Sequence, residues 1–513
     1  MDEYGKLADG VGAAQPEIPT PEQVGAWVER AFRTGTFKLD GEFGLARRST
    51  ERTERALERV HRELPSWIDP HSLEQAGWGV ITPGNRQIYL DLLRPLLRRR
   101  ESQAGRLYRE FSRSRRLSAE HFLKEHRETP GTIDPKKVPY YLLIVGSPEE
   151  IPFEFQYHLS LSHAVGRVWF PERDSYRKYA EAVCQAEKEG VERPRKVTVF
   201  SVEDNPTARA IGEALVPPVR RLIAEGFPDW ELEIVRRERA VKSRLASLLG
   251  GGETPGLLLV STHGRNAPDE ETRHLAQGAL LCERESGNAA KDGPVLFSAA
   301  DLAEEPADLH GLIGMLFACY SVGTPVLDSF PHTAEGLGPE AALETRPRVI
   351  SRRPMLASLP VTLLERGALA VLGHIDRGWG TSFFWGFESG DVGTLYSLED
   401  ALTQLLRGQR LGHALRPLSR RYSQLASRLA QMLDMNRVGA QPDPGWLGLY
   451  WTAVNDARNF VVLGDPAVYL RGRRPSEVTI QLDPHILERI QRLARGRRES
   501  AEAWIRTTLE RHL

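Results

Sequence analysis

Two short motifs in the middle of the chain carry residue types that can perform nucleophilic catalysis together. The dipeptide His263-Gly264 follows the apolar run Leu257–Ser261, and Cys319 follows the apolar run Gly314–Ala318. A cysteine attacks as its thiolate, and a nearby imidazole can take the thiol proton and later protonate the leaving amine. The two motifs therefore predict that Cys319 is a nucleophile and that His263 is its general base and acid.

Gly264 can contribute to the same chemistry through its backbone. Because glycine lacks a Cβ, its N–H can approach a reacting carbonyl and, with the N–H of Cys319, hold the oxyanion. Such a donor lowers the barrier by ~3–4 kcal/mol. The plainer interpretation is that Cys319 packs as a small apolar side chain and His263 is a structural histidine. Finding both motifs after apolar runs favours catalysis.

The elements that must position these residues are buried strands. Short apolar runs alternate with helical stretches from residue 140 onward, which predicts an α/β fold for 140–470, with a mainly parallel sheet and helices on both faces. Reactive groups in such sheets gather where the strands end at their carboxyl edge. If 257–261 and 314–318 are parallel neighbours, His263 and Cys319 face one cleft. The runs lie at 140–146, 197–202, 232–235, 257–261, 312–318, 370–375 and 460–463.

At these motifs the sequence resembles the caspase-like cysteine peptidases, the clan of caspases, separases, gingipains and bacterial CHAT-domain proteases. The resemblance rests on His263-Gly264 and on the segment Phe317–Ser321, which contains Cys319. The interval between the two motifs is close to the ~50 residues that separate histidine and cysteine in caspases. Phe317 and Ser321 replace the glutamine and the final glycine of the caspase pattern, which favours the broader CHAT group.

Three further segments look gingipain-like and CHAT-like, namely Leu143–Pro152, Ala164–Arg167 and Phe460–Pro466. The resemblance covers about residues 140–470. It implies a caspase-like α/β sandwich in which a non-catalytic α/β subdomain at 140–195 precedes the protease domain.

The resemblance also suggests a specificity pocket. The segment His374–Trp379 is similar to the separase and CHAT loop that carries an acid in the pocket for the side chain before the cut. It implies that Asp376 selects Arg or Lys through a charge-assisted hydrogen bond, with Trp379 as a pocket wall. Asp376 could equally be an ordinary loop acid or helix cap, and Glu203 and Asp204 are rival acids at another strand end. The sequence indicates no third catalytic residue.

The last 43 residues follow a different pattern. A basic connector at 471–476 precedes a stretch with alternating apolar residues and two short helical patterns, which resembles the ribbon-helix-helix family. In that family two chains pair their strands and the outward residues, here Thr479 and Gln481, contact DNA. Residues 471–513 hold ten arginines against six acidic residues, which suits such a face. The resemblance implies a homodimer and DNA binding, and the alternative is a helical hairpin packed on the same chain.

Composition limits the remaining function classes. With 68 Lys and Arg against 69 Asp and Glu, no global charge steers the chain to nucleic acid or to an anionic membrane. The start of the chain lacks a signal-peptide pattern and the longest apolar run, 311–327, is short for a membrane span, so we expect no membrane association. Three cysteines form no disulfide framework, which suits the cytoplasm. No zinc, zincin or phosphate-loop motif occurs, so we predict neither metal nor cofactor.

The predicted function is that of a cysteine endopeptidase of the caspase-like, CHAT class, which cleaves protein substrates by a Cys-His dyad after a basic residue. The resemblance implies a regulated bacterial effector, for example in defence. The alternative is a DNA-binding regulator or dimeric scaffold whose caspase-like body is a sensor. The predicted parts are a disordered tail at 1–20, a mainly helical region at 21–139, the subdomain at 140–195, the protease domain at 196–470 and the module at 471–513.

Overall fold

The computed structural model describes most of the region between residues 64 and 470 and a few short stretches outside it. The described residues are 24–26, 28–29, 64–84, 86–113, 118–128, 133–190, 193–250, 252–267, 273–284, 293–303, 308–330, 349–383, 395–437, 442–470, 489–494, 501, 504–505 and 508. The predicted tail at 1–20 and the residues Thr479 and Gln481 lie outside this set.

One ten-stranded sheet organises the molecule, in the order β2-β1-β3-β4-β14-β13-β10-β7-β5-β6. All of its neighbouring pairs are parallel except β13 and β14, which are antiparallel. The predicted α/β class with a large, mostly parallel sheet is confirmed. The strands are β1 Trp78–Pro83, β2 Tyr108–Arg113, β3 Tyr141–Val145, β4 Ala164–Val168, β5 Lys196–Ser201, β6 Glu231–Arg236, β7 Leu257–Ser261, β10 Ile313–Phe317, β13 Ala370–His374 and β14 Phe460–Gly464.

The single antiparallel pair divides the sheet into two halves that run in opposite directions. Strands β1 to β4 with β14 form one half, and β5, β6, β7, β10 and β13 form the other. The carboxyl ends of the two halves therefore lie at opposite edges. The region 21–139, predicted to be mainly helical, contributes β1 and β2 to this sheet, and β3 pairs directly with β1.

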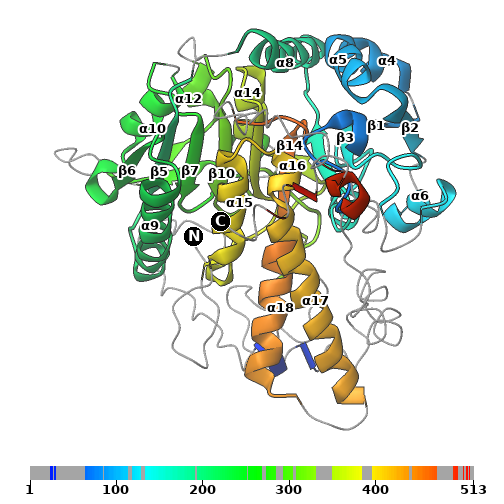
Figure 1. Ribbon diagram of the computed structural model, residues 1–513. Helices are drawn as coiled ribbons and strands as arrows, with labels where there is room; N and C mark the ends of the chain where they lie inside the picture. Colours follow the sequence, from blue (N-terminus) through cyan, green and yellow to red (C-terminus); the bar gives the residue numbers. More distant parts are fainter. Residues whose placement is uncertain are drawn as a thin grey trace.

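Helices cover both faces of the sheet (Figure 1). The crossover from β5 to β6 runs towards one edge and that from β10 to β13 towards the other, so right-handed connections place α9 and α14 on opposite faces. The helices are α3 Leu73–Ala76, α4 Arg86–Leu92, α5 Arg94–Ala104, α6 Ala119–Glu125, α7 Phe153–Leu159, α8 Arg173–Gln185, α9 Pro206–Gly226, α10 Lys242–Leu249, α11 Arg273–Ala276, α12 Ala299–Ala303, α14 Ser358–Glu365, α15 Tyr396–Leu406, α16 Leu411–Ala414, α17 Arg416–Arg437 and α18 Pro444–Arg458.

Short elements complete the body. They are the helical turns η1 Gly105–Leu107, η2 Ala186–Gly190, η3 Arg237–Arg239 and η5 Gly380–Ser382, and the two-stranded ladders β8 Leu280–Cys282 with β9 Val295–Phe297 and β11 Gly323–Thr324 with β12 Met355–Leu356.

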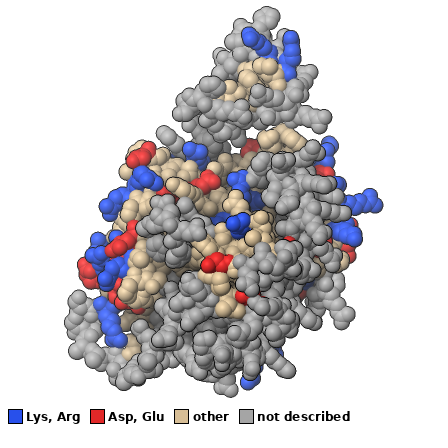
Figure 2. All heavy atoms as spheres, turned by 90° about the horizontal axis from the view of Figure 1, so that it is seen from below, with Lys and Arg blue, Asp and Glu red and all other residues tan. Residues whose placement is uncertain are grey.

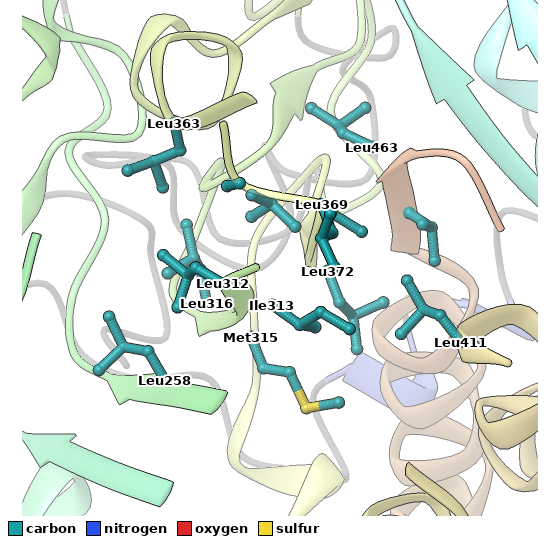
Figure 3. Close-up of a cluster of buried hydrophobic side chains, with 14 of the residues drawn as sticks. Leu258, Leu312, Ile313, Met315, Leu316, Leu363, Leu369, Leu372, Leu411 and Leu463 are labelled. Carbon is teal, nitrogen blue, oxygen red and sulfur yellow. The ribbon is translucent and has the colours of Figure 1, made fainter. Parts of the chain in front are cut away.

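The core lies on both sides of the central strands. Every residue of β7, β10 and β13 is buried, which is why these strands read as continuous apolar runs in the sequence. Figure 3 shows Ile313 and Met315 of β10 beside Leu372 of β13 on one face of the sheet, and Leu316 of β10 with Leu258 of β7 and Leu363 of α14 on the other. This packing holds the ends of the three strands in fixed positions.

A buried polar cluster joins the end of β14 to β1 and α5. Asp465, which directly follows β14, accepts hydrogen bonds from Arg100 Nε at 2.7 Å and Trp78 Nε1 at 3.0 Å. At the β4–β14 contact a Cβ on Gly166 would lie 2.1 Å from the Gly464 oxygen. The segments Gly166-Arg167 and Gly464-Asp465-Pro466, which are part of the resemblance, thus lie at the β4–β14 contact.

The helices α17 and α18 form a hairpin that extends away from the sheet (Figure 1). Asp443 caps α18, accepting a hydrogen bond from Trp446 N at 3.0 Å, and Pro444 occupies the first turn. No helix among the described residues is both long and apolar enough to cross a membrane.

Candidate active site

The strands that carry the histidine and the cysteine are neighbours. β7 and β10 are parallel with Ser261 opposite Phe317, and Thr262 N donates to Phe317 O at 3.2 Å. The condition on which a shared cleft depends, that the two strands are parallel neighbours, is met. His263 and Cys319 each stand two residues beyond that last pair, at the same edge of the sheet.

Gly264 lies directly against the backbone of Cys319. A Cβ at position 264 would be 1.7 Å from the Cys319 oxygen and 2.9 Å from its nitrogen, far inside van der Waals contact. Only a residue without a side chain allows the two backbones to approach this closely. The close approach brings Gly264 and Cys319, the two predicted oxyanion donors, side by side.

His263 is buried, and its Nε2 is held by two residues that follow β5. Nε2 lies 2.9 Å from Asp204 Oδ1 and 2.8 Å from Asn205 Nδ2. The ring can donate to the carboxylate when Nε2 is protonated, or accept from the amide when it is not. Asn205 Oδ1 also accepts from Ala208 N at 2.9 Å, which caps α9 and fixes the amide.

Asp204 is the acid that the sequence alone did not assign to the histidine. Burial alone would raise the pKa of Asp204, but the hydrogen bond and charge of His263 outweigh it and hold that pKa below its ordinary value. The Asp204 side chain is 36% exposed and borders a hollow of about 770 Å³. In the sequence, the sign of this role is that Asp204 follows the apolar run 197–202. The sequence does not reveal that β5, the strand formed by this run, lies beside β7.

Cys319 is fully buried beneath the loop that follows β13. Gly378 N donates to Cys319 Sγ at 3.3 Å, and the sulfur lies 3.7 Å from Gly378 O. Tyr320, next along the chain, has φ of 55°, a left-handed conformation that costs about 1–3 kcal/mol in a residue other than glycine. Its N–H donates to Asp376 O at 2.8 Å, so the same loop also holds the strained turn.

Asp376 and Trp379 both belong to this loop. Asp376 is fully buried and accepts from Arg377 N at 2.8 Å and Ser329 N at 3.2 Å. Burial, with the charge of nearby Asp328, raises the pKa of Asp376 to about 6. Trp379 is also buried. The structure therefore places both predicted pocket residues within one to three residues of the peptide that contacts the thiol.

The guanidinium of Arg377 is buried beside the acids of these loops. Arg377 Nη2 is 2.7 Å from Asp328 Oδ2, and both side chains are at most 2% exposed. Two carboxylates, Asp328 and Asp376, thus share one arginine. The indole of Trp379 packs against the ring of Phe330, with centroids 4.9 Å apart.

Glu203 and Cys282 line the same hollow as Asp204. Glu203, the other rival acid, pairs with Arg236 and with Arg237 Nε, the latter at 3.1 Å. Burial raises the pKa of Cys282 to about 12, so that thiol stays protonated near neutral pH. Within the described part of the chain no group of three or more His, Cys, Asp or Glu side chains is arranged to hold a metal ion.

Comparison with known proteins does not identify a family for this chain. No family model and no curated protein matches the chain. A solved structure described as "Structure of Protease" is 12% identical, with 77% of this chain and 78% of that chain covered and a TM-score of 0.44. A likeness of that degree supports no statement about the activity of this chain.

Proposed function

We propose that the chain is a cysteine endopeptidase of the caspase-like, CHAT class that cleaves protein substrates after a basic residue. The observation that carries the proposal is the placement of His263-Gly264 and Cys319 at the ends of the adjacent parallel strands β7 and β10. Asp204, 2.9 Å from the imidazole, adds the acid that such a site uses to orient its histidine.

Each residue of the proposed site acts in a defined step of the cleavage reaction. His263 takes the proton from Cys319 Sγ, and the thiolate attacks the scissile carbonyl carbon to form a tetrahedral oxyanion held by the N–H groups of Gly264 and Cys319. The C–N bond then breaks, and His263 gives its proton to the leaving amine, which leaves a thioester. Water attacks the thioester, loses a proton to His263, and the carboxylic acid and thiol are released. Asp204 stabilises the imidazolium in both halves of the reaction.

The preference for a basic residue rests on charge. Asp328 and Asp376 are both buried and share one cation, Arg377, so one negative charge is left over when both carboxylates are ionised. A low-polarity site with one uncompensated carboxylate favours a second cation that can bond it in a charge-assisted way. An Arg or Lys side chain of a protein substrate supplies that cation, with Trp379 as a wall.

The rest of the chain would localise or regulate this activity in a cytoplasmic bacterial effector, for example in defence. The predicted parts at 1–20, 21–139, 140–195, 196–470 and 471–513 belong to this proposal, as does a homodimer formed by the last part. Thr479 and Gln481 would contact DNA there. Light scattering of the full chain and of a chain that ends at residue 470 tests the dimer, because equal monomer masses would contradict it.

The runner-up is a DNA-binding regulator or dimeric scaffold whose caspase-like body is a sensor without turnover. One observation favours it: Cys319 is fully buried beneath Gly378, whereas a nucleophile must meet its substrate. A sensor body would keep all its binding functions in a Cys319→Ala variant.

Hydrolysis of fluorogenic peptides that end in Arg, Lys, Leu or Asp decides between the two. The peptidase predicts cleavage after Arg and Lys, its loss in Cys319→Ala, and its retention in Cys184→Ala, a control at a half-buried thiol outside the site. Activity that survives in Cys319→Ala would contradict the mechanism. Equal cleavage after Leu and Arg would remove the basic preference.

A further inference from the structure

The loop that covers Cys319 is held from its far side by an acid on the helical hairpin. Asp456 of α18 is fully buried. It accepts hydrogen bonds from Trp379 N at 2.8 Å, from Thr381 Oγ1 at 2.8 Å and from Ser382 Oγ at 2.5 Å. All three donors belong to residues 379–382, so one carboxylate from a distant helix organises this stretch.

The surroundings of Asp456 keep it ionised. Burial alone would raise its pKa, but the contact with His374, whose Nε2 lies 3.3 Å from Oδ1, and the charge of Arg421 hold the pKa below its ordinary value. Hydrogen bonds to an ionised carboxylate are about twice as strong as neutral ones. The hold on residues 379–382 is therefore strong.

Neighbouring residues of the hairpin hold the same region. Arg421 Nη2 of α17 donates to Thr381 O at 2.5 Å, and Arg458 Nη2 of α18 donates to Ser329 Oγ at 2.9 Å. Ser329 N in turn donates to Asp376. The base of the hairpin thus contacts both segments that surround the buried cysteine.

Gly378 lies between the segment that Asp456 binds and the thiol of Cys319. Asp456 binds the N–H of Trp379, and the preceding residue, Gly378, contacts Cys319 Sγ through its own N–H at 3.3 Å. A shift of Trp379 N must move the carbonyl oxygen of Gly378, which lies 3.7 Å from the sulfur, because the two atoms belong to one planar peptide group. The position of α18 therefore sets how the thiol is covered.

The other end of the hairpin packs against the beginning of the chain. Val24 and Val28 are buried in a cluster with apolar residues of α17 and α18, and a Cβ on Gly25 would lie 1.4 Å from the Pro444 oxygen. In Figure 1 the short blue segments lie at the lower end of the hairpin, away from the sheet. The hairpin thus spans the distance between residues 24–29 and the loop over Cys319.

We propose that Asp456 is a positioning residue that couples the α17–α18 hairpin to the access of Cys319. While Asp456 holds residues 379–382, Gly378 covers the sulfur, and displacement of the hairpin base uncovers it. The inference rests on the proposed role of Cys319 and adds the part of the chain that regulates it. In this proposal a signal reaches Cys319 through the hairpin, whose outer end packs against Val24 and Val28.

The test is the rate at which iodoacetamide alkylates each cysteine of the full chain, measured by peptide mass spectrometry. Asp456→Asn keeps the size of the side chain but removes its charge and places an amide donor against the loop. We expect the alkylation rate of Cys319 to rise about tenfold or more, as the loss of charge-assisted hydrogen bonds implies. The rate at Cys282, which is also buried but lies outside the loop, stays unchanged.

Asp174→Asn, at an exposed acid of α8 outside the hairpin, is the matched control and leaves both rates at the wild-type values. An unchanged Cys319 rate in Asp456→Asn would overturn the proposal. So would an equal rise at Cys282, because it would show a general loosening of the fold. If Asp456→Asn does not fold, Ser382→Ala removes one donor from the loop side, and a smaller rise confined to Cys319 is the expected result.

Alkylation needs no turnover, so this test separates the inference from the proposed function. A selective rise at Cys319 in a protein that never cleaves peptides would support the coupling and reject the peptidase. Peptide cleavage together with an unchanged Cys319 rate would do the reverse.

Discussion

Asp204 and Asn205, which follow β5, both contact Nε2 of His263, and these contacts decide how the imidazole can act. With Nε2 bonded to Asp204 or Asn205, only Nδ1 is left to exchange a proton with Cys319. The carboxylate stabilises the ring when it becomes an imidazolium, whereas the amide can only orient the neutral form. The acid is therefore the residue on which turnover depends more.

Asp204→Ala should lower kcat for an Arg peptide by about 100-fold, since general acid–base catalysis contributes factors of this size. The unfolding midpoint should change little because the side chain is partly exposed. Glu213→Ala, at an exposed acid on α9, is the control with unchanged kcat. A wild-type kcat in Asp204→Ala would mean that the histidine needs no acid.

The raised pKa of Asp376 gives the specificity pocket a pH dependence. Above about pH 6 the carboxylate is ionised and attracts a guanidinium, and below it the group is neutral and the attraction is lost. The ratio of kcat/KM for a peptide ending in Arg to that for its neutral isostere citrulline should therefore fall as the pH drops through about 6.

Taking the ratio removes the titration of His263 and Cys319, which both substrates share. A ratio that stays constant between about pH 5 and 8 would exclude Asp376 as the selector of basic residues.

At the scale of the elements, the close contact between the ends of β7 and β10 places Gly264 against the backbone of Cys319 and brings His263 to the same edge of the sheet. A methyl group at position 264 would overlap the Cys319 carbonyl, so the two strand ends would have to separate. Gly264→Ala should lower the free energy of unfolding by about 1–3 kcal/mol, as overpacking does, and should abolish peptide cleavage.

Urea unfolding measures this loss, with Gly252→Ala as the control at a glycine with open space around it. The control should be neutral or slightly stabilising because alanine restricts the unfolded chain. Equal stability of Gly264→Ala and wild type would show that the two backbones can part without cost.

The elements also show where sequence is informative. The apolar runs predicted β3, β5, β6, β7, β10, β13 and β14, because the signal is local and most residues of these strands, except those of the edge strand β6, are buried. The edge strand β2 was missed since its pattern, Tyr108–Arg113, is polar with only two buried residues. The role of Asp204 could not be predicted because the order β7-β5-β6 is a property of the whole sheet.

At the scale of the molecule, the residues of the proposed site follow strands of one half of the sheet. β5, β7, β10 and β13 supply the four loops of the site, and their carboxyl ends share one edge. The other half runs in the opposite direction and meets this one at the β13–β14 pair, where Asp465 and Arg100 form a buried ion pair nearby. It therefore supports the site without contributing to it.

Over most of the face shown in Figure 2, the charges of the described residues do not gather by sign. On the face in Figure 2, Lys and Arg side chains lie among Asp and Glu side chains, in line with 68 basic and 69 acidic residues in the whole chain. Long-range attraction of a charged partner is thus weak. In the proposed function, substrate selection therefore falls to the buried acids Asp328 and Asp376.

Covalent trapping tests the central claim most directly. A peptidyl acyloxymethyl ketone that ends in Arg is attacked by an activated thiolate, and intact-mass and peptide mass spectrometry count and locate the adduct. The account predicts one adduct per chain, on Cys319, no adduct in Cys319→Ala, and strongly slowed labelling in His263→Ala. An adduct on Cys184 or Cys282, or equal labelling of wild type and His263→Ala, would contradict it.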